Sequence, residues 1–523
     1  MKRIISLFLI YISITQLSSH HGYAMEDLLE NHKTSRILNK TQDNFEKSLD
    51  LSNERHSQKP LYLILSVRSP AIIPLHKILN GIPAKRLLLV AGSKFFSEEE
   101  KEKLSPFFNT ILRIDNYRDS GQLEMEVFKL YKEKPFQKVI AYHEYDLLRA
   151  ARIRSFFKLE GQDYQSAIIF RDKIAMKDLL SKAGIKVPFF ARINSPLDIF
   201  EFTEKYGFPA VVKPIFGTGA DGVFILKNIQ DSEKFINKYK GFNDYHLTDL
   251  EIESFVKGTT YHVDGFVKDG AIIASWPSIC INHCVDLKEG SYVAHHHLSP
   301  ENPMVERLNN YTKTVLDALP TPKNTAFLLE VFHDEQKDDI VFCEIAARVG
   351  GGVKEMWPEA FEIDLENEFI RMQAGLELSP KLTQFSNSST PTIQNISGWI
   401  IFPKPLGILK SIPEVTPFSW VKEYIVRAKS NIINLPTKNV SDSLASAFIV
   451  CDSEKQFKER ADLLNVWLQK ESQWEKTFIS PITVECIETC EKCMESSEKI
   501  KSKFSANCAK SCSHCITEHK ETN

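Results

Sequence analysis

Two glutamates stand alone inside apolar strand patterns, and this feature constrains the fold more than any other. Glu330 lies within FLLEVF and Glu344 within VFCEI. A buried carboxylate costs free energy unless a cation or N–H donors compensate it. The polar turn 333–339 predicts a hairpin that brings both carboxylates to one face, where hard oxygen ligands suit Mg²⁺, with Mn²⁺ as the alternative ion. In the competing interpretation both side chains face solvent on the polar side of a strand.

Cations and a glycine-rich loop precede this hairpin. Lys173 lies on a predicted helix, and Lys213 ends the apolar strand VVKP. The loop FGTGADGV follows, and Gly217, Gly219 and Gly222 let its backbone N–H groups approach a phosphate. It is neither a P-loop nor a dinucleotide fingerprint, because no Gly-Lys-Ser/Thr follows and the next element is a strand. Taken singly, the lysines also fit solvated side chains, and the loop also fits a simple hairpin.

An arginine completes the set of charged candidates. Arg348 follows Glu344 by four residues and precedes the glycine triplet 350–352. Such an arginine can neutralise a transferring phosphoryl group or an acyl phosphate. Cations, backbone donors and carboxylates together predict a site for ATP and Mg²⁺.

In this order, the motifs resemble the ATP-grasp superfamily. Within it the chain is most similar to the L-amino acid ligases, which make dipeptides, because EIAAR stands at 344–348 and SGW and FPKPLG follow at 397–407. The resemblance covers about 59–480. It implies a ligase that activates a small carboxylate as an acyl phosphate and joins it to an amine, forming an amide or peptide bond between amino-acid-like substrates.

The resemblance also implies roles for further residues. Glu253, Phe255 and Val256 match a hinge strand that holds adenine through backbone groups. His297 matches a substrate-side histidine and joins Arg348 as a candidate catalytic residue; its unperturbed pKa near neutrality would let it take a proton. Two positions depart from the pattern. Thr260 stands where a ribose-binding carboxylate is common. Ala294 stands where a glutamate faces the substrate, so the first substrate is open to being other than an ordinary α-amino acid.

The chain is predicted to be a multidomain α/β and α+β protein; 523 residues suggest about three or four domains. Apolar runs alternate with amphipathic stretches over 59–155, which predicts a small parallel α/β domain before the ATP-grasp domain. The ATP-grasp domain is expected at 156–388. A smaller α+β domain is expected at 389–480.

The net charge and the two ends of the chain indicate which binding partners and which cellular location to expect. The net charge of −3 is too balanced to favour nucleic acid or an anionic membrane. Residues 1–24 have the layout of a secretory signal peptide, and 25–58 are a polar linker. We therefore expect an exported protein, or a cytoplasmic one if the signal is false. No later segment is apolar enough for a membrane helix, and a homodimer is left open.

A cysteine-rich tail, 481–523, is predicted to form short helices. It repeats the spacing C-x3-C-x2-C at Cys486, Cys490, Cys493, Cys508, Cys512 and Cys515. We interpret these as disulfides, which suit export; a zinc or iron–sulfur site is the alternative. Two other functions are alternatives for the whole chain. One is a degenerate ATP-grasp nucleotide-binding module, and the other is a biotin-carboxylase-like carboxylating enzyme.

Overall fold

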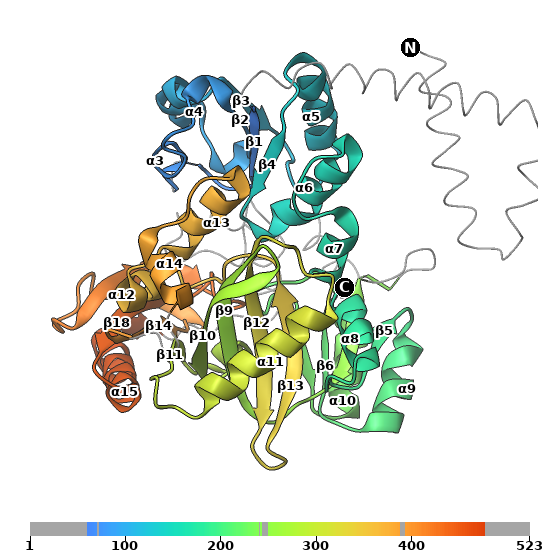
Figure 1. Ribbon diagram of the computed structural model, residues 1–523. Coiled ribbons are helices and arrows are strands. Elements are labelled where there is room, and N and C mark those ends of the chain that lie inside the picture. Colours follow the sequence, from blue (N-terminus) through green and yellow to red (C-terminus); the bar gives the residue numbers. More distant parts are fainter. Residues whose placement is uncertain (1–59, 71–72, 240, 243–248, 388–392, 476–523) are drawn as a thin grey trace, which may run out of the picture. The chain divides into compact units, whose positions relative to one another are not determined.

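The computed structural model describes residues 60–70, 73–239, 241–242, 249–387 and 393–475 (Figure 1). The expected signal peptide at 1–24, the linker at 25–58 and the cysteine tail at 481–523 lie outside these residues. In the part of the chain described, no helix is long and apolar enough to cross a membrane.

The first sheet is parallel, with strand order β3-β2-β1-β4. Its strands are β1 (Tyr62–Ser66), β2 (Leu87–Gly92), β3 (Thr110–Ile114) and β4 (Lys138–Ala141), and its helices are α3 (Leu75–Ile78), α4 (Glu98–Leu104), α5 (Gln122–Glu133) and α6 (Glu144–Phe157). Alternate residues of β1 enter two different cores: Leu63 packs with α5 and α6, and Ile64 packs with α3. Helix α13 (Leu365–Ala374) contributes to the second of these cores. The expectation of strands buried on both faces is confirmed.

A second sheet, β5-β8-β6-β7, separates apolar from charged side chains. Its elements are β5 (Phe190–Ile193), β6 (Ala210–Pro214), β7 (Phe224–Leu226), β8 (Leu250–Ser254), α8 (Lys173–Lys182), α9 (Pro196–Tyr206) and α10 (Ile229–Lys238). Val212 and Ile252 pack with apolar side chains of α9 and α10. The alternate residues Lys213, Glu251 and Glu253 point to the opposite face, because successive strand residues alternate.

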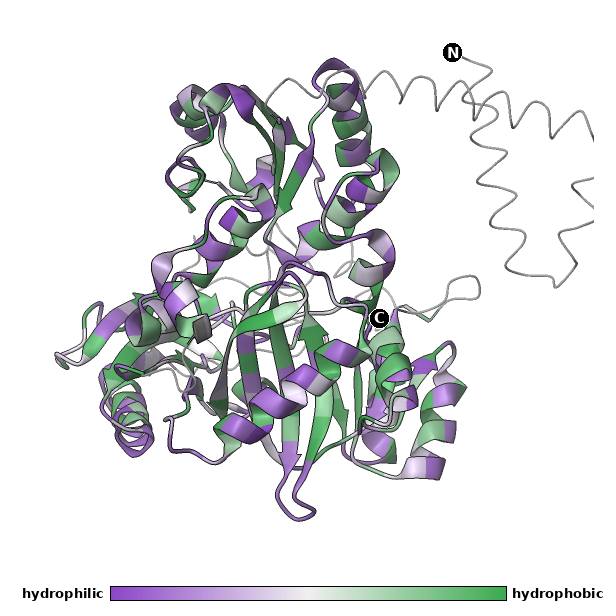
Figure 2. Cartoon of the chain, viewed as in Figure 1, coloured by the Kyte–Doolittle hydropathy of each residue, from purple (hydrophilic) through white to green (hydrophobic). Residues whose placement is uncertain are grey.

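The largest sheet has eight strands in the order β13-β12-β9-β10-β11-β14-β18-β16. They are β9 (Thr259–Lys268), β10 (Ala271–Ile281), β11 (Val293–His297), β12 (Thr325–Asp334), β13 (Asp339–Ala346), β14 (Ile396–Phe402), β16 (Val421–Val426) and β18 (Ala445–Cys451). One face packs on α11 (Met304–Ala318) and α15 (Glu454–Glu471). Figure 2 shows the mixed hydropathy of α11, whose Leu308 and Val315 are buried. Strands β14, β16 and β18 of this sheet come from 389–480, the range in which the smaller α+β domain was expected.

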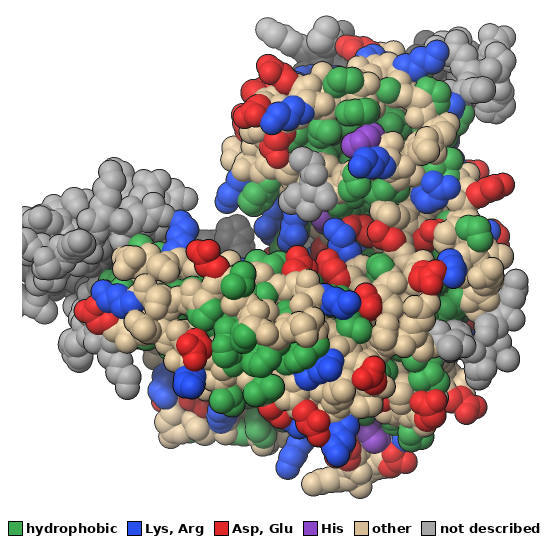
Figure 3. Space-filling view, turned by 90° about the vertical axis from the view of Figure 1, so that its left-hand side faces the viewer, with side chains coloured by type: hydrophobic (Ala, Val, Ile, Leu, Met, Phe, Trp, Pro, Cys, Tyr) green, Lys and Arg blue, Asp and Glu red, His purple; other side chains and the backbone are tan. Residues whose placement is uncertain are grey.

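The described residues form six further α-helices and β-strands. They are α7 (Tyr164–Ile169), α12 (Met356–Phe361), α14 (Pro380–Asn387), β15 (Gly407–Ser411), β17 (Ile433–Asn434) and β19 (Gln473–Glu475). A parallel sheet with antiparallel sheets confirms the predicted mixed α/β architecture. On the face drawn in Figure 3, acidic and basic side chains are interspersed.

Candidate active site

The carboxylates of Glu330 and Glu344 come from neighbouring strands. Glu330 on β12 is the register partner of Glu344 on β13, so the predicted hairpin with both on one face is confirmed. Burial, and then the carboxylate of Glu344, raise the pKa of Glu330 to about 8. Burial also opposes ionisation of Glu344, but Lys173, Lys213 and Arg348 outweigh it and hold its pKa at about 2. Near neutral pH Glu344 is therefore ionised, while Glu330 tends to keep its proton.

This donor set fits magnesium. Among the residues that the structure describes, no group of three or more His, Cys, Asp or Glu side chains is arranged to hold a metal ion. Magnesium bound to nucleotide does not need such a group, because one or two carboxylates plus phosphate oxygens complete its coordination. A cation held by Glu330 and Glu344 would also offset the burial and the repulsion from Glu344 that raise the pKa of Glu330.

Lys173 connects the carboxylates to the glycine-rich loop. It begins α8, directly after Asp172, which caps the helix by accepting hydrogen bonds from two backbone N–H groups. Its ammonium lies 2.8 Å from Glu344 Oε2 and donates to the Gly217 carbonyl at 2.8 Å. Lys173, which is predicted to bind phosphate, therefore lies between Glu344, the predicted metal ligand, and the glycine-rich loop.

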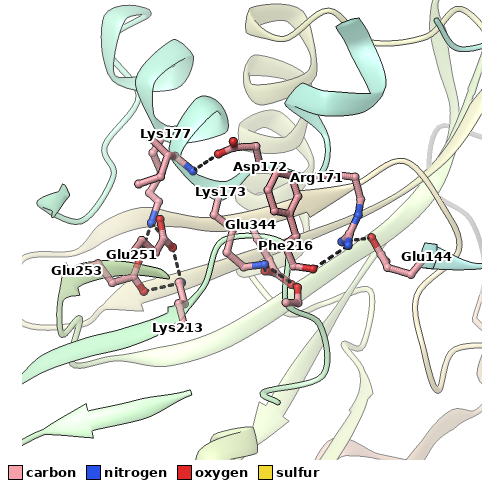
Figure 4. Close-up of polar contacts among 12 residues, drawn as sticks. Glu144, Arg171, Asp172, Lys173, Lys177, Lys213, Phe216, Glu251, Glu253 and Glu344 are labelled. Carbon is pink, nitrogen blue, oxygen red and sulfur yellow. Dashed lines mark hydrogen bonds and ion pairs between the residues drawn. The ribbon is translucent and has the colours of Figure 1, made fainter. Parts of the chain in front are cut away.

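Lys213 belongs to a buried network of four charges (Figure 4). Its ammonium lies 2.6 Å from Glu253 Oε1 and 3.7 Å from Glu251 Oε1. Lys177 Nζ lies 2.8 Å from Glu251 Oε1 and 2.6 Å from Glu253 Oε2. Sequence reasoning named Lys213 and Glu253 but missed Lys177 and Glu251. Two ammonium and two carboxylate groups balance one another, which is the condition for burying such charges.

The two carboxylates of this network differ in their pKa values. Burial opposes ionisation of Glu253, but Lys177 and Lys213 hold its pKa at about 2. Burial raises the pKa of Glu251 despite the same two lysines. Glu253 is thus the carboxylate that fixes Lys213. This contact uses the side chain of Glu253, whereas the predicted contact with adenine uses its backbone.

Arg348 is held by a residue of the parallel-sheet domain. Glu144, in the first turn of α6, accepts a hydrogen bond from Arg348 Nε and another, at 2.5 Å, from Arg171. Arg171 also donates to the Phe216 carbonyl at 2.7 Å. Although burial opposes ionisation of Glu144, the two guanidinium groups lower its pKa. Sequence reasoning missed Glu144 and Arg171, which join Arg348 to the glycine-rich loop.

In the glycine-rich loop, which is predicted to bind phosphate, two glycines adopt a left-handed backbone conformation. Gly219 and Gly222 have φ of +65° and +70°, a region that glycine enters without strain. A Cβ on Gly222 would approach Pro214 Cγ to 2.8 Å. The Gly217 N–H donates to the Pro214 carbonyl at 3.1 Å. The loop thus folds closely over the end of β6, the strand that carries Lys213.

The predicted adenine hinge follows β8. The Phe255 N–H donates to the Pro209 carbonyl at 3.2 Å, which ties the hinge to β6. The Phe255 N–H is therefore already paired within the protein, and the role of this segment in holding adenine stays a prediction. Thr260, in the predicted ribose position, hydrogen-bonds to His283 Nδ1 at 2.8 Å.

Two residues of β11 that were singled out in the sequence, His297 and Ala294, lie on opposite faces of the strand. His297 is fully buried between Trp357 and Phe361, and burial lowers its pKa to about 3. Its imidazole therefore stays neutral and is a poor proton acceptor. Ala294 does not face the substrate side, because an odd offset in a strand reverses the face. It packs in the core with Phe402 and Leu464.

Asp264 on β9 is a further carboxylate that the sequence reasoning missed. It is fully buried, and its Oδ1 accepts a hydrogen bond from the Gly350 N–H at 3.2 Å. Burial raises its pKa to about 7, although Arg348 and the Gly350 N–H act in the opposite direction.

This shift predicts a pH dependence of stability. Between about pH 4 and pH 7 the unfolded chain ionises Asp264 while the folded chain keeps it protonated, so stability falls as pH rises. The Asp264→Asn variant lacks this effect and should gain on the order of 3 kcal/mol relative to wild type across that window. Urea unfolding at several pH values measures the difference. Equal pH slopes for the two proteins would show that Asp264 ionises normally.

Comparisons with known proteins agree with this geometry. Residues 170–301 match the RimK-like ATP-grasp domain. The L-arginine-specific L-amino acid ligase of Bacillus subtilis is 25% identical over 316 residues, which cover 59% of this chain and 72% of that protein. The crystal structure of an L-amino acid ligase from Bacillus licheniformis superposes with a TM-score of 0.62 and 17% identity, covering 80% of this chain and 100% of that chain. A carboxyaminoimidazole ribonucleotide synthase from Aspergillus clavatus, complexed with ATP, has a TM-score of 0.56 and 13% identity over 79% and 99%.

Residues 170–301 match an ATP-grasp domain, and the fold is that of the ATP-grasp structures, so the predicted resemblance is confirmed. The predicted enzyme class, an ATP-dependent ligase that forms C–N bonds, is the class of these relatives. Among ATP-grasp proteins the chain is similar to the L-amino acid ligases, as the motifs predicted.

Proposed function

We propose that the chain is an ATP- and Mg²⁺-dependent carboxylate–amine ligase that acts on amino-acid-like substrates. The observation that supports this best is the arrangement around the Glu330–Glu344 pair. Lys173 contacts Glu344, and Lys213 and Arg348 interact electrostatically with both carboxylates. Such a set binds polyphosphate and stabilises charge that develops on a transferring phosphoryl group.

The reaction has two steps. A carboxylate oxygen of the first substrate attacks the γ-phosphorus of ATP in line, and the bond from that phosphorus to the ADP oxygen breaks. The amine nitrogen of the second substrate then attacks the acyl carbon, loses a proton and expels inorganic phosphate. Glu330 and Glu344 would hold Mg²⁺, which supplies charge neutralisation and alignment of the phosphates when bound.

The charged side chains have separate tasks. Lys173, between Glu344 and the glycine-rich loop, is positioned to donate to a phosphate oxygen of bound nucleotide. Lys213 is fixed by Glu253 and presents its charge from the end of a rigid strand. Arg348, aligned by Glu144, stabilises the acyl phosphate. The glycine-rich loop excludes water that would hydrolyse this intermediate.

The test measures ADP formation and new amide products. Purified protein is incubated with ATP, Mg²⁺ and a pool of amino acids, and products are identified by mass spectrometry. We expect ADP and an amide in equal amounts, and neither with Glu344→Ala. ADP no higher than in that variant would refute the ligase for these substrates. ADP that depends on bicarbonate instead would identify a carboxylating enzyme.

A further inference from the structure

The glycine-rich loop, residues 216–223, is held at both ends by cationic side chains that donate to its carbonyl oxygens. Near its start, Arg171 and Lys173 donate to two successive carbonyls at 2.7 Å and 2.8 Å. At its end, Lys288 Nζ donates to the Val223 carbonyl at 2.8 Å. Arg171 and Lys173 belong to the site described above, whereas Lys288 reaches the loop from outside it.

Lys288 belongs to η5 (Cys284–Glu289), a 3₁₀ helix between β10 and β11. Its ammonium also lies 5.6 Å from the centre of the Phe224 ring, at a distance where a cation is attracted to the aromatic face. Glu289, the next residue, pairs with Lys227, with 2.8 Å between Oε1 and Nζ. Phe224 begins β7 and Lys227 follows it. The contacts of η5 therefore extend from the end of the loop along the strand that comes after it.

The segment that carries Lys288 is itself fixed to the large sheet. His283, directly before η5, forms a hydrogen bond of 2.8 Å through Nδ1 to the hydroxyl of Thr260 on β9. Asp286 accepts a hydrogen bond from the His283 N–H at 2.8 Å. Leu287, beside Lys288, is buried with 1% of its surface exposed. Lys288 thus holds the end of the loop from a base that does not belong to the loop.

The tip of the loop is held less firmly than its ends. The Asp221 N–H donates to the Thr218 carbonyl at 3.3 Å, and the Val223 N–H donates to the Ala220 carbonyl at 3.4 Å. Both distances are longer than is usual for N–H···O hydrogen bonds. Ala220 also has φ of +59°, a left-handed conformation that is unfavourable for alanine. A segment with fixed ends and a weakly bonded tip can open locally while the rest of the fold stays intact.

We propose that Lys288 is a positioning residue of the ligase reaction, which holds the end of the glycine-rich loop and so keeps the loop closed over the acyl phosphate. This inference rests on the proposed ligase function. Lys288 acts through the Val223 carbonyl and the loop, and the reacting atoms lie beyond them.

The consequence concerns the fate of the acyl phosphate. While the loop is closed, the amine attacks the acyl carbon and inorganic phosphate leaves. When the loop opens, the oxygen of a water molecule attacks instead, the bond between acyl group and phosphate breaks, and a proton passes to solvent. The carboxylate and inorganic phosphate are then released, so ATP is consumed without an amide.

The test measures the ratio of ADP to amide with ATP, Mg²⁺ and the same pool of amino acids. The variant is Lys288→Met, which keeps an unbranched side chain against Phe224 but loses the donor and the charge. Lys288→Arg keeps both. The control is Lys268→Met, at an exposed position at the end of β9. Hydrogen exchange of the amides in 216–223, measured by mass spectrometry with Mg²⁺ and ADP present, reports opening of the loop without any turnover.

We expect ADP and amide in equal amounts from wild type, Lys268→Met and Lys288→Arg. Lys288→Met should release about five times more ADP than amide, and its loop amides should exchange about tenfold faster, on the scale of one partly exposed hydrogen bond from a charged group. A protein that merely unfolds loses both products together and keeps their ratio.

A ratio of ADP to amide near one in Lys288→Met would therefore overturn the proposal, whether the total activity is normal or reduced. An excess of ADP as large in Lys288→Arg or in Lys268→Met would overturn it as well.

The two proposals fail in different ways. Faster exchange of the loop amides in Lys288→Met, in a protein that releases no ADP, refutes the ligase and keeps Lys288 as the residue that holds the loop closed. Equal amounts of ADP and amide from every variant, with unchanged exchange of the loop, keep the ligase and refute this role of Lys288.

Discussion

Replacing Glu344 with alanine is expected to lower ATP turnover by about a thousandfold, the scale on which electrostatic stabilisation of a transition state is lost. The substitution removes a metal ligand and the carboxylate that positions Lys173. It also removes the negative charge opposite Glu330, so the pKa of Glu330 should fall, and this gain should offset most of the stability that is lost with the Lys173 ion pair. Steady-state ADP release and thermal unfolding, measured on the same sample, separate these effects.

The matched control is Glu301→Ala, which removes an exposed glutamate between β11 and α11. It should retain wild-type turnover and stability. An active Glu344→Ala protein would refute the assignment of this carboxylate to the reacting phosphates. An inactive variant that also unfolds early would mean that Glu344 acts through the fold.

Replacing Lys177 with methionine is expected to destabilise the chain by about 3–5 kcal/mol, the cost of leaving buried charges without their partner. Lys177 is fully buried and pairs with both Glu251 and Glu253. Without it, Lys213 alone must neutralise two carboxylates, and one of them must take up a proton. The measurement is the free energy of unfolding in urea.

A second substitution tests whether an unpaired buried carboxylate causes the expected destabilisation of the Lys177→Met protein. Glu251→Gln in the Lys177→Met background removes the carboxylate left in excess and should restore part of the lost stability. Lys182→Met, at the exposed end of the same helix, should change stability by less than about 0.5 kcal/mol. A Lys177→Met protein as stable as wild type would show that the buried network does not depend on this lysine.

The sequence predicted the parts of the site that depend on local patterns. The lone charges in FLLEVF and VFCEI predicted the hairpin, and the register places Glu330 opposite Glu344. The runs of apolar residues predicted strands buried on both faces, as β1 shows. The comparisons support the ATP-grasp class that the order of these motifs indicated.

The missed residues depend on contacts between distant parts of the chain. Lys177 and Glu251 are 74 residues apart, and Glu144 and Arg348 are 204 apart. No local pattern specifies such pairs. A partial signal was nonetheless present, because Lys177 follows Lys173 by one helical turn, and residues four apart share a helix face. Glu251 likewise lies two residues before Glu253, on the same face of its strand.

The error at Ala294 has a different origin. The resemblance places a substrate-facing glutamate three residues before His297, and this spacing does not take the alternation of strand residues into account. Three residues along a strand lead to the opposite face, and in β11 this face packs in an apolar core. Asp264 lies on the same face as Glu330, as the pairing of His262 with Glu330 shows.

The central claim is that the chain activates a carboxylate with ATP. It is tested most directly by following oxygen from an amino acid pool labelled with ¹⁸O in the carboxyl group. Formation of an acyl phosphate followed by attack of the amine leaves one carboxylate oxygen on the phosphate that is released. The account predicts ¹⁸O-labelled inorganic phosphate equal in amount to the amide formed. Phosphate released without the label, while ADP forms, would contradict it.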